Sequence, residues 1–185
     1  MTSDEDLKNA RSGGRNLSGA DLEGAKLKGV NLENVDLSRA NLHNSYLHYA
    51  NLRNANLSGA DLSGAYVFQA NFEGANLKNT NLTCHMTQAK FKGADLRNAN
   101  LENKYAGGAD FENANLSGAN LEGTDLRNVN FKNTNLKNAN LKNAYLSGDF
   151  GVNFEGTNLE GADLRNANLS GADLSKAKLD GAVGI

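Results

Sequence analysis

A five-residue period runs through almost the whole chain and limits what it can fold into. The unit is a small residue, Asn or Asp, Leu, a polar residue, and Gly or Asn, as the stretch 50–64 illustrates three times in succession. It keeps one register over residues 15–84, resumes at Ala89 after a first slip and ends at Gly181 after a second. Neither the 3.6-residue period of a helix nor the 2.0-residue period of a strand fits this spacing.

Each unit is best interpreted as a short extended piece followed by a corner. Gly or Asn at every fifth residue suits a sharp bend with positive φ. The small residue and the central Leu or Phe would point inward, and the other three outward. Such units cannot bury their apolar side alone, so they must stack as a solenoid. A mean hydropathy of -0.56 fits this, because two inward residues in five fill a thin interior.

This repeat closely resembles the pentapeptide-repeat family, whose consensus is Ala-(Asp/Asn)-Leu-x-x, over about nine-tenths of the chain. The resemblance implies an all-β fold, a right-handed quadrilateral β-helix with four pentads in each coil, one on each side. We expect about eight coils, stacked about 4.8 Å apart, in a single domain over residues 15–181. Residues 1–14 would form an irregular or short-helical N-terminal cap, and residues 182–185 a C-terminal tail.

The first slip separates Leu82 from Phe91 by nine residues, where the repeat requires five or ten. Either four residues loop out, or one pentad is a residue short. With a short pentad, residues one coil apart form an inward column of Leu32, Leu52, Phe72, Phe91, Phe111 and Phe131. Its outward neighbours then alternate in charge, as Glu33, Arg53, Glu73, Lys92, Glu112 and Lys132.

Opposite charges facing each other across neighbouring strands are favourable. We therefore predict the shortened pentad, with Met86 or Thr87 pointing inward. The second slip is predicted to be a bulge of three extra residues, 149–151, after which the same column continues to Phe154 and Glu155.

The same alignment places all five tyrosines of the chain on one side. Along it the position before the central residue is Lys26, Tyr46, Tyr66, the shortened unit, Tyr105, Asp125, Tyr145 and Asn168. Exposed aromatic residues are typical of interaction hot spots, although aromatic rungs also stabilise a ladder by stacking. Both interpretations stay open, and the candidate interaction face comprises Tyr46, His48, Tyr49, Tyr66, Phe68, Tyr105 and Tyr145. In the worst-fitting repeat Lys104 takes a small inward slot, so it must swing outward or distort the coil.

No catalytic or metal-binding constellation is visible, and no cofactor is predicted. His43 and His48 occupy outward slots on adjacent sides, and Cys84 and His85 are the only Cys/His neighbours. A metal site needs three or four convergent ligands, so we interpret them as solvent-exposed bystanders. An acid/base pair needs a cleft, so we assign a surface and corner-bonding role to the aspartates that replace Asn, namely Asp21, Asp36, Asp61, Asp95, Asp110, Asp125, Asp163 and Asp173.

The charge of the chain does not indicate a nucleic-acid partner. The net charge is -2. One coil carries one basic residue on each of its four sides, namely Arg127, Lys132, Lys137 and Lys142. A nucleic-acid groove would need them on one face, so a solvated belt is favoured. A single cysteine, no signal-peptide core in residues 1–14 and no stretch that could cross a membrane suggest a cytoplasmic protein.

The leading functional hypothesis is a non-enzymatic scaffold that binds a protein partner through a side of the rod. The alternative follows from the resemblance: some pentapeptide-repeat proteins mimic B-form DNA and bind DNA gyrase, which would require a predominantly acidic surface. Few residues follow Leu179, so the last coil should present unpaired backbone groups and apolar rungs. A homodimer through the C-terminal coil is therefore expected.

Overall fold

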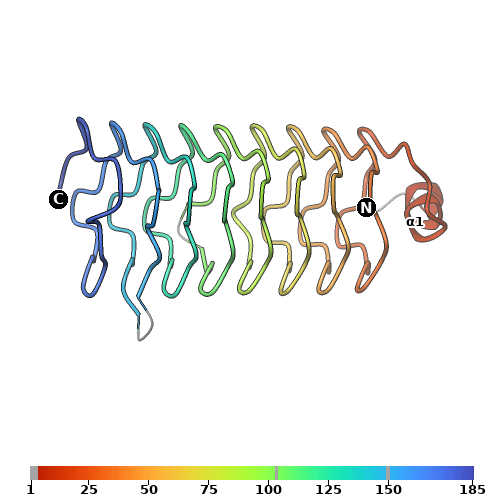
Figure 1. Ribbon diagram of the computed structural model, residues 1–185. Helices are drawn as coiled ribbons and strands as arrows, with labels where there is room; N and C mark the ends of the chain where they lie inside the picture. Colours follow the sequence, from red (N-terminus) through yellow and green to blue (C-terminus); the bar gives the residue numbers. More distant parts are fainter. Residues whose placement is uncertain (1–3, 103, 149–150) are drawn as a thin grey trace.

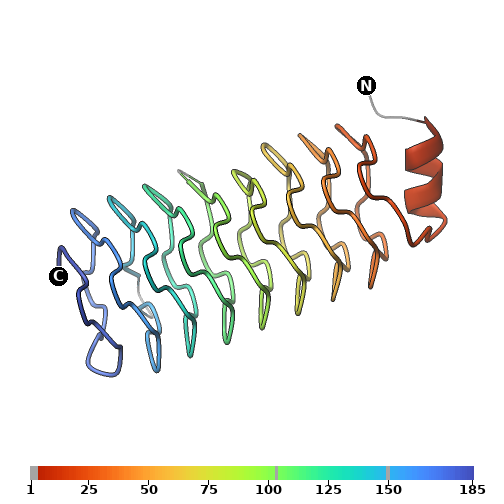
Figure 2. The same cartoon turned by 90° about the horizontal axis from the view of Figure 1, so that it is seen from above.

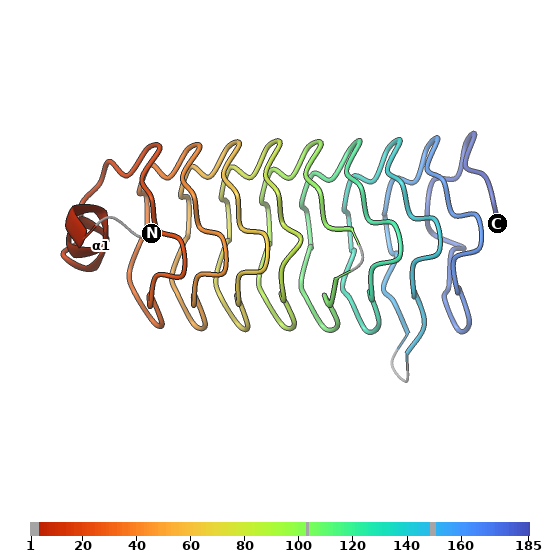
Figure 3. The ribbon, with the colours of Figure 1, turned by 180° about the vertical axis from the view of Figure 1, so that it is seen from behind.

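The computed structural model describes residues 4–102, 104–148 and 151–185. One helix, α1 (Asp4–Arg11), precedes a rod of stacked coils, and the C-terminus lies at the far end of that rod (Figure 1). The rod is a right-handed quadrilateral β-helix, as predicted. Its stack of coils is continuous from the front and from behind (Figure 3).

Parallel bridges one coil apart hold the rod together. No extended strand forms in the described part of the chain; each side contributes one isolated bridge residue per coil, at the Asn or Asp position. On one side these residues are Asn16, Asp36, Asn56, Asn76, Asp95, Asn115, Asn135, Asn158 and Lys178. These nine rungs give eight complete coils and the start of a ninth, which confirms the predicted length.

The corners show why Gly and Asn recur. At a typical corner the N–H of Ala20 donates to the carbonyl of Leu17 over 3.0 Å, and Gly19, the second of the two residues between them, has φ +70°. Asn takes the same left-handed conformation at other corners, for example Asn34 with φ +59°. The Asn or Asp side chain closes the turn from outside, because the Oδ1 of Asp36 accepts the N–H of Ser38 at 2.9 Å.

The interior consists of columns of Leu or Phe alternating with small residues, nearly all of them buried. In one column the rings of Phe72, Phe91, Phe111, Phe131 and Phe154 stack with centroid separations of 5.0, 4.8, 5.5 and 5.8 Å. We call the wall over this column the phenylalanine side.

The first slip is a shortened pentad, as predicted. His85 pairs with Tyr66 and Lys90 with Asn71, so no residues loop out. Met86 is fully buried and Thr87 is not, which resolves the open choice in favour of Met86. The shortened pentad has one residue fewer at its corner. There the N–H of Cys84 donates to the carbonyl of Leu82 at 2.6 Å, which closes a three-residue turn in place of the usual four-residue turn.

The second slip also keeps the column in register. Asn153 pairs with Asn130 one coil earlier, and Phe154 stacks on Phe131. Of the predicted bulge, residues 149 and 150 lie outside the described residues, whereas Gly151 donates its N–H to the carbonyl of Gly148 over 3.0 Å.

Helix α1 lies across the end of the first coil (Figure 2). It ends in a Schellman motif, since the N–H of Gly14 donates to the carbonyl of Asn9 at 2.9 Å and Gly13 has φ +80°. Ala10 is buried and Leu7 packs against the core. No helix in the described residues has the length and apolarity needed to span a membrane.

Side chains of α1 also bond the backbone edge that the first coil would otherwise leave unpaired. The Oδ2 of Asp6 accepts the N–H of Asp21 at 3.0 Å, and Arg11 donates to the carbonyl of Lys26 at 3.1 Å. The helix thus covers both the apolar rungs and the polar edge at this end of the rod.

Candidate functional site

One side of the rod differs chemically from the other three. Elsewhere the bridge residues are mostly Asn and Asp, and their amides bond along the rod, as Asn51 Nδ2 does to Asn31 Oδ1 at 3.0 Å. On the side we call the tyrosine side, the corresponding residues are Lys26, Tyr46, Tyr66, His85, Tyr105, Asp125, Tyr145 and Asn168. Rings therefore replace amides along most of this wall.

Four of these rings form a continuous stack. Tyr46 and Tyr66 have centroids 5.3 Å apart with an interplanar angle of 13°. His85 lies between Tyr66 and Tyr105, at 5.5 Å and 6° from the former and 5.3 Å and 15° from the latter. The outer edges remain open to solvent, with Tyr66 39% and Tyr105 55% exposed. The stack is thus both a structural ladder and an aromatic surface.

The remaining candidate residues lie beside the first two rungs. His48 is 5.8 Å from the ring of Tyr66, and Tyr49 meets Phe68 edge-on at 5.7 Å. The ammonium of Lys28 lies 5.7 Å from the ring centroid of Tyr49. Phe68 is only partly exposed, so its contribution to the surface is smaller than the sequence suggested.

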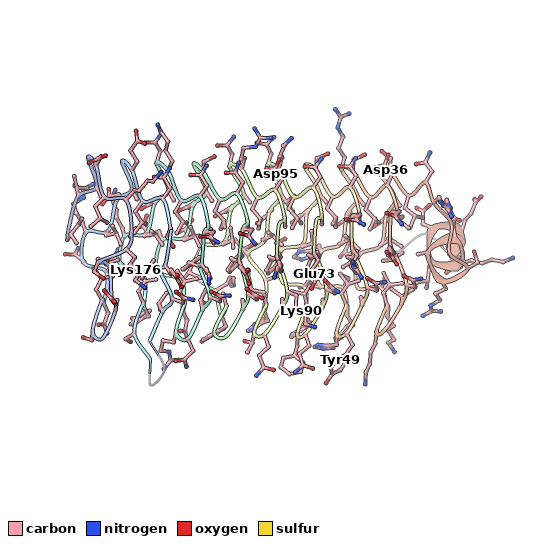
Figure 4. The ribbon with its side chains drawn as sticks, viewed as in Figure 1. Asp36, Tyr49, Glu73, Lys90, Asp95 and Lys176 are labelled. Atoms are coloured by element: carbon pink, nitrogen blue, oxygen red, sulfur yellow. The ribbon has the colours of Figure 1, made fainter. Side chains whose placement is uncertain are left out.

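Tyr49 stands at a corner with φ +60°. This left-handed conformation is costly for a bulky residue. In Figure 4, Tyr49 lies along one edge of the rod, opposite the edge that carries Asp36 and Asp95.

His85 is the ladder member that the sequence analysis missed. Its slot falls in the shortened pentad, where the usual spacing to the neighbouring tyrosines is broken. Counting 19 rather than 20 residues onward from Tyr66 would have placed it between two rings.

Cys84 is not the exposed bystander that we predicted: it is fully buried, because it takes the small inward slot. Burial disfavours the thiolate and raises the pKa of the Cys84 thiol to about 12, so it is a poor nucleophile. His43 bonds Ser63, its Nδ1 lying 2.8 Å from the hydroxyl. Within the described ranges, no three His, Cys, Asp or Glu side chains converge as metal ligands would.

The repeat aspartates have the corner-bonding role predicted for them. Each accepts a backbone N–H from the residue two positions later, in the set Asp21, Asp36, Asp61, Asp95, Asp110, Asp125, Asp163 and Asp173. Hydrogen bonds from Arg97 and Arg127 lower the pKa of Asp95 and of Asp125 respectively. The carboxylates of Asp95 and Asp125 are therefore held ionised and are unsuited to proton transfer near neutral pH.

Many basic side chains form ion pairs with carboxylates of the same or the next coil. In the predicted belt, Arg127 pairs with Asp125 and Lys132, Lys137 and Lys142 pair with Glu155, Glu160 and Asp163, over 2.6 to 3.4 Å. On the phenylalanine side the predicted alternation appears as Arg53–Glu73, Lys92–Glu112 and Lys132–Glu155 pairs. Glu73 lies on the wall that faces the viewer in Figure 4. The walls are therefore mixed in charge.

Lys104, the misfit in a small inward slot, borders a hollow on the tyrosine side. It is half-buried and lines a hollow of 390 Å³ together with Tyr105, Gly123, Asp125, Arg127 and Tyr145. A second hollow, of 630 Å³, adjoins it and shares Tyr105, Asp125 and Arg127. The surface is therefore hollowed where the ring ladder is interrupted.

Comparison with known proteins identifies the repeat and shows that other proteins share the fold. A family model described as pentapeptide repeats matches in 8 copies, over residues 16–48, 45–83, 68–103, 107–148 and 150–183. HetL of the cyanobacterium Nostoc sp. strain PCC 7120, a pentapeptide repeat protein involved in heterocyst differentiation regulation, is 29% identical with a TM-score of 0.80, covering 99% of this chain and 97% of HetL.

A second solved structure shares the fold at lower identity. QnrB1, a plasmid-mediated fluoroquinolone resistance protein, is 20% identical with a TM-score of 0.63, and the match covers 90% of each chain. Among curated proteins, no sequence match was found.

Proposed function

Because the chain belongs to the pentapeptide-repeat family, we propose that it is a non-enzymatic scaffold that binds a protein partner through its tyrosine side. Proteins of this family are generally structural or interaction modules. The observation that carries the proposal is the exposed stack of Tyr46, Tyr66, His85 and Tyr105 on a rod whose other bridge positions are mostly amides and carboxylates.

Physical chemistry favours this wall for binding. Interface centres are enriched in aromatic residues and depleted of charged ones, and truncating a central Tyr commonly has a large effect on affinity. The rings are already ordered by stacking, so binding immobilises few new rotamers. The phenylalanine side, by contrast, presents charges paired with each other, which a partner would have to desolvate.

The test compares two double variants as bait. Tyr46→Ala with Tyr66→Ala removes two rungs, whereas Ser58→Ala with Ser117→Ala changes the opposite side and serves as the matched control. Proteins retained from a cell extract are identified and quantified for each bait, after circular dichroism has shown that both variants are folded. We expect a specific partner to be lost with the tyrosine variant and kept with the control; equal retention by both variants would mean that the assigned surface is wrong.

We propose homodimerisation through the last coil on separate grounds. Leu169, Leu174 and Leu179 are only partly buried there, and Val183 and Ile185 are 47% and 60% exposed. A second copy would cover these rungs and pair the open backbone edge. Sedimentation across a concentration series is expected to show a dimer, and a monomer mass at every concentration would contradict it.

The alternative partner is DNA gyrase, bound by mimicry of DNA. The likeness in shape to a rod such as that of QnrB1 favours it, but the paired basic residues on the walls do not. Gyrase supercoiling that is unaffected by micromolar protein would remove this alternative. We also propose a cytoplasmic location, which suits a single free thiol and which cell fractionation would test.

A further inference from the structure

The aromatic ladder lacks one rung, at Asp125. Asp125 pairs with Tyr105 on one side and with Tyr145 on the other, so the two tyrosines lie two coils apart with a carboxylate where a ring would stand. The 390 Å³ hollow is lined by these three residues. The interruption is therefore an open space between two rings.

An occupied rung of the same ladder shows what would fit this space. His85 fills the equivalent position between Tyr66 and Tyr105 and stacks on both, at 5.5 and 5.3 Å. Two coil spacings amount to about 9.6 Å, so Tyr105 and Tyr145 are separated much as Tyr66 and Tyr105 are. Tyr105 and Tyr145 are also 55% and 53% exposed, against 39% for Tyr66, which has a ring on each side.

The charges around the space define the ligand further. The guanidinium of Arg127 holds Asp125 through bonds of 2.8 and 2.6 Å, so this pair is neutral overall. Lys104 lines the same hollow, and no ion pair joins its ammonium to a described residue. The net charge of the lining is positive, which favours an anionic ligand.

We propose that the space between Tyr105 and Tyr145 is a slot for one aromatic side chain of a protein partner, flanked by carboxylates in the partner's own sequence. The ring would take the missing rung and stack on both tyrosines, and the carboxylates would pair with Lys104 and with the exposed edge of Arg127. This proposal rests on the proposed function, because it adds a second contact, besides Tyr46 and Tyr66, through which the tyrosine side would recognise the same partner.

The probe is a short peptide, N-acetyl-Glu-Trp-Glu-amide, followed by indole fluorescence. The chain contains no tryptophan, so the signal comes from the peptide alone. We expect saturable binding that weakens at least about tenfold in Tyr145→Ala, since stacking on one ring is lost. Tyr46→Ala, four rungs from Asp125, is expected to bind as the unchanged protein does.

The position of Asp125 offers a pair of variants that separate space from charge. Asp125→Tyr completes the ladder with a residue that the same column already uses four times, so the variant should fold and lose peptide binding. Asp125→Asn keeps the space open and makes it more positive, so it should bind at least as tightly. Lys104→Ala should weaken the acidic peptide but leave N-acetyl-Gln-Trp-Gln-amide unchanged.

The experiments can refute the slot and the scaffold independently of each other. No saturable binding, or binding that survives in folded Asp125→Tyr, overturns the slot. Equal binding of adenosine monophosphate with the same response to the variants would identify a nucleobase site and also overturn it. A partner that is lost with Tyr46→Ala and Tyr66→Ala but kept with Asp125→Tyr would refute the slot and leave the scaffold proposal standing. Peptide binding lost in Asp125→Tyr, with no partner lost from any bait, would support the slot and refute the scaffold.

Discussion

Ser45 offers the sharpest test of the packing described above. It takes the small inward slot on the tyrosine side and is fully buried. Its backbone is satisfied, because its N–H donates to Leu42 at 3.1 Å and its carbonyl accepts from Tyr66 at 2.9 Å. Its hydroxyl, however, has no hydrogen-bond partner in the part of the chain that the structure describes.

Threonines in the same kind of slot show what Ser45 lacks. The hydroxyl of Thr124, in the same column, donates to the carbonyl of Leu101 at 2.7 Å. Thr80 and Thr134 make the equivalent bond at 2.9 and 2.6 Å. For Ser45 the corresponding acceptor is the carbonyl of Leu22, 23 residues earlier as in these threonines.

Deleting a hydroxyl should therefore have opposite effects at the two positions. A buried hydroxyl without a partner costs about 1–3 kcal/mol. Ser45→Ala removes that cost and leaves the backbone bonds, so the free energy of unfolding should rise by about 1 kcal/mol or more. Thr124→Val keeps the shape and removes a satisfied bond, so the free energy of unfolding should fall by about 1 kcal/mol.

Urea denaturation followed by circular dichroism measures both changes. At an unchanged slope, the midpoint should move up for Ser45→Ala and down for Thr124→Val. A lower midpoint for Ser45→Ala would show that the hydroxyl is bonded in solution, and it would refute the reasoning for this column.

Three further predictions concern other parts of the rod. Phe111→Ala should lower the free energy of unfolding by about 3–5 kcal/mol, whereas Phe111→Leu, which restores the residue used at Leu52, should cost only about 1 kcal/mol; equal losses in urea denaturation would contradict the stacked column. Arg39→Asn should raise that free energy by up to about 1 kcal/mol, because Arg39 has φ +57°, and a lower midpoint would mean that the Arg39 side chain contributes more than the strain costs. The pKa values of Asp36, Asp95 and Asp125 are lowered in the folded state, so their contribution to stability is present above the unfolded value of about 3.9 and is lost as the pH falls below it; the melting temperature should hold down to about pH 5 and drop below about pH 4, and a rise on acidification would contradict this.

The fold could be predicted in detail because the five-residue repeat assigns each residue to a side and a coil of the rod. The side chains one coil apart must stack, so the charge alternation around Arg53 and Lys92 was enough to choose a shortened pentad over a loop. A loop would have moved Lys92 to another side, and the column after Glu73 would have continued as Arg97, Ser117 and Lys137, which does not alternate throughout. The pairing of His85 with Tyr66 confirms that choice.

The details that could not be predicted depend on backbone geometry at irregular points. Nothing in the repeat shows that Cys84 closes a three-residue turn with Leu82, and this turn is what buries the thiol and turns His85 outward. At the N-terminus the choice between a helix and an irregular cap depended on tertiary contacts, such as those of Asp6 and Arg11 with the first coil. An eight-residue helix is marginal by itself, so local propensity could not decide it.

The candidate site, too, could be predicted from the sequence only in part. That the tyrosines share a side follows from counting, but whether they stack depends on ring angles, and whether a missing ring leaves room depends on its neighbours. At Asp125 the carboxylate is drawn toward Arg127 along its own coil, while Lys104, a residue that violates the repeat, turns to the same hollow. If a small residue interrupted the ladder, the neighbouring side chains would close the gap or water would fill it. Here the ladder is interrupted by an ion pair that is neutral overall, with an added cation beside it and a half-exposed ring on each side. Together these features make the gap a candidate recognition site.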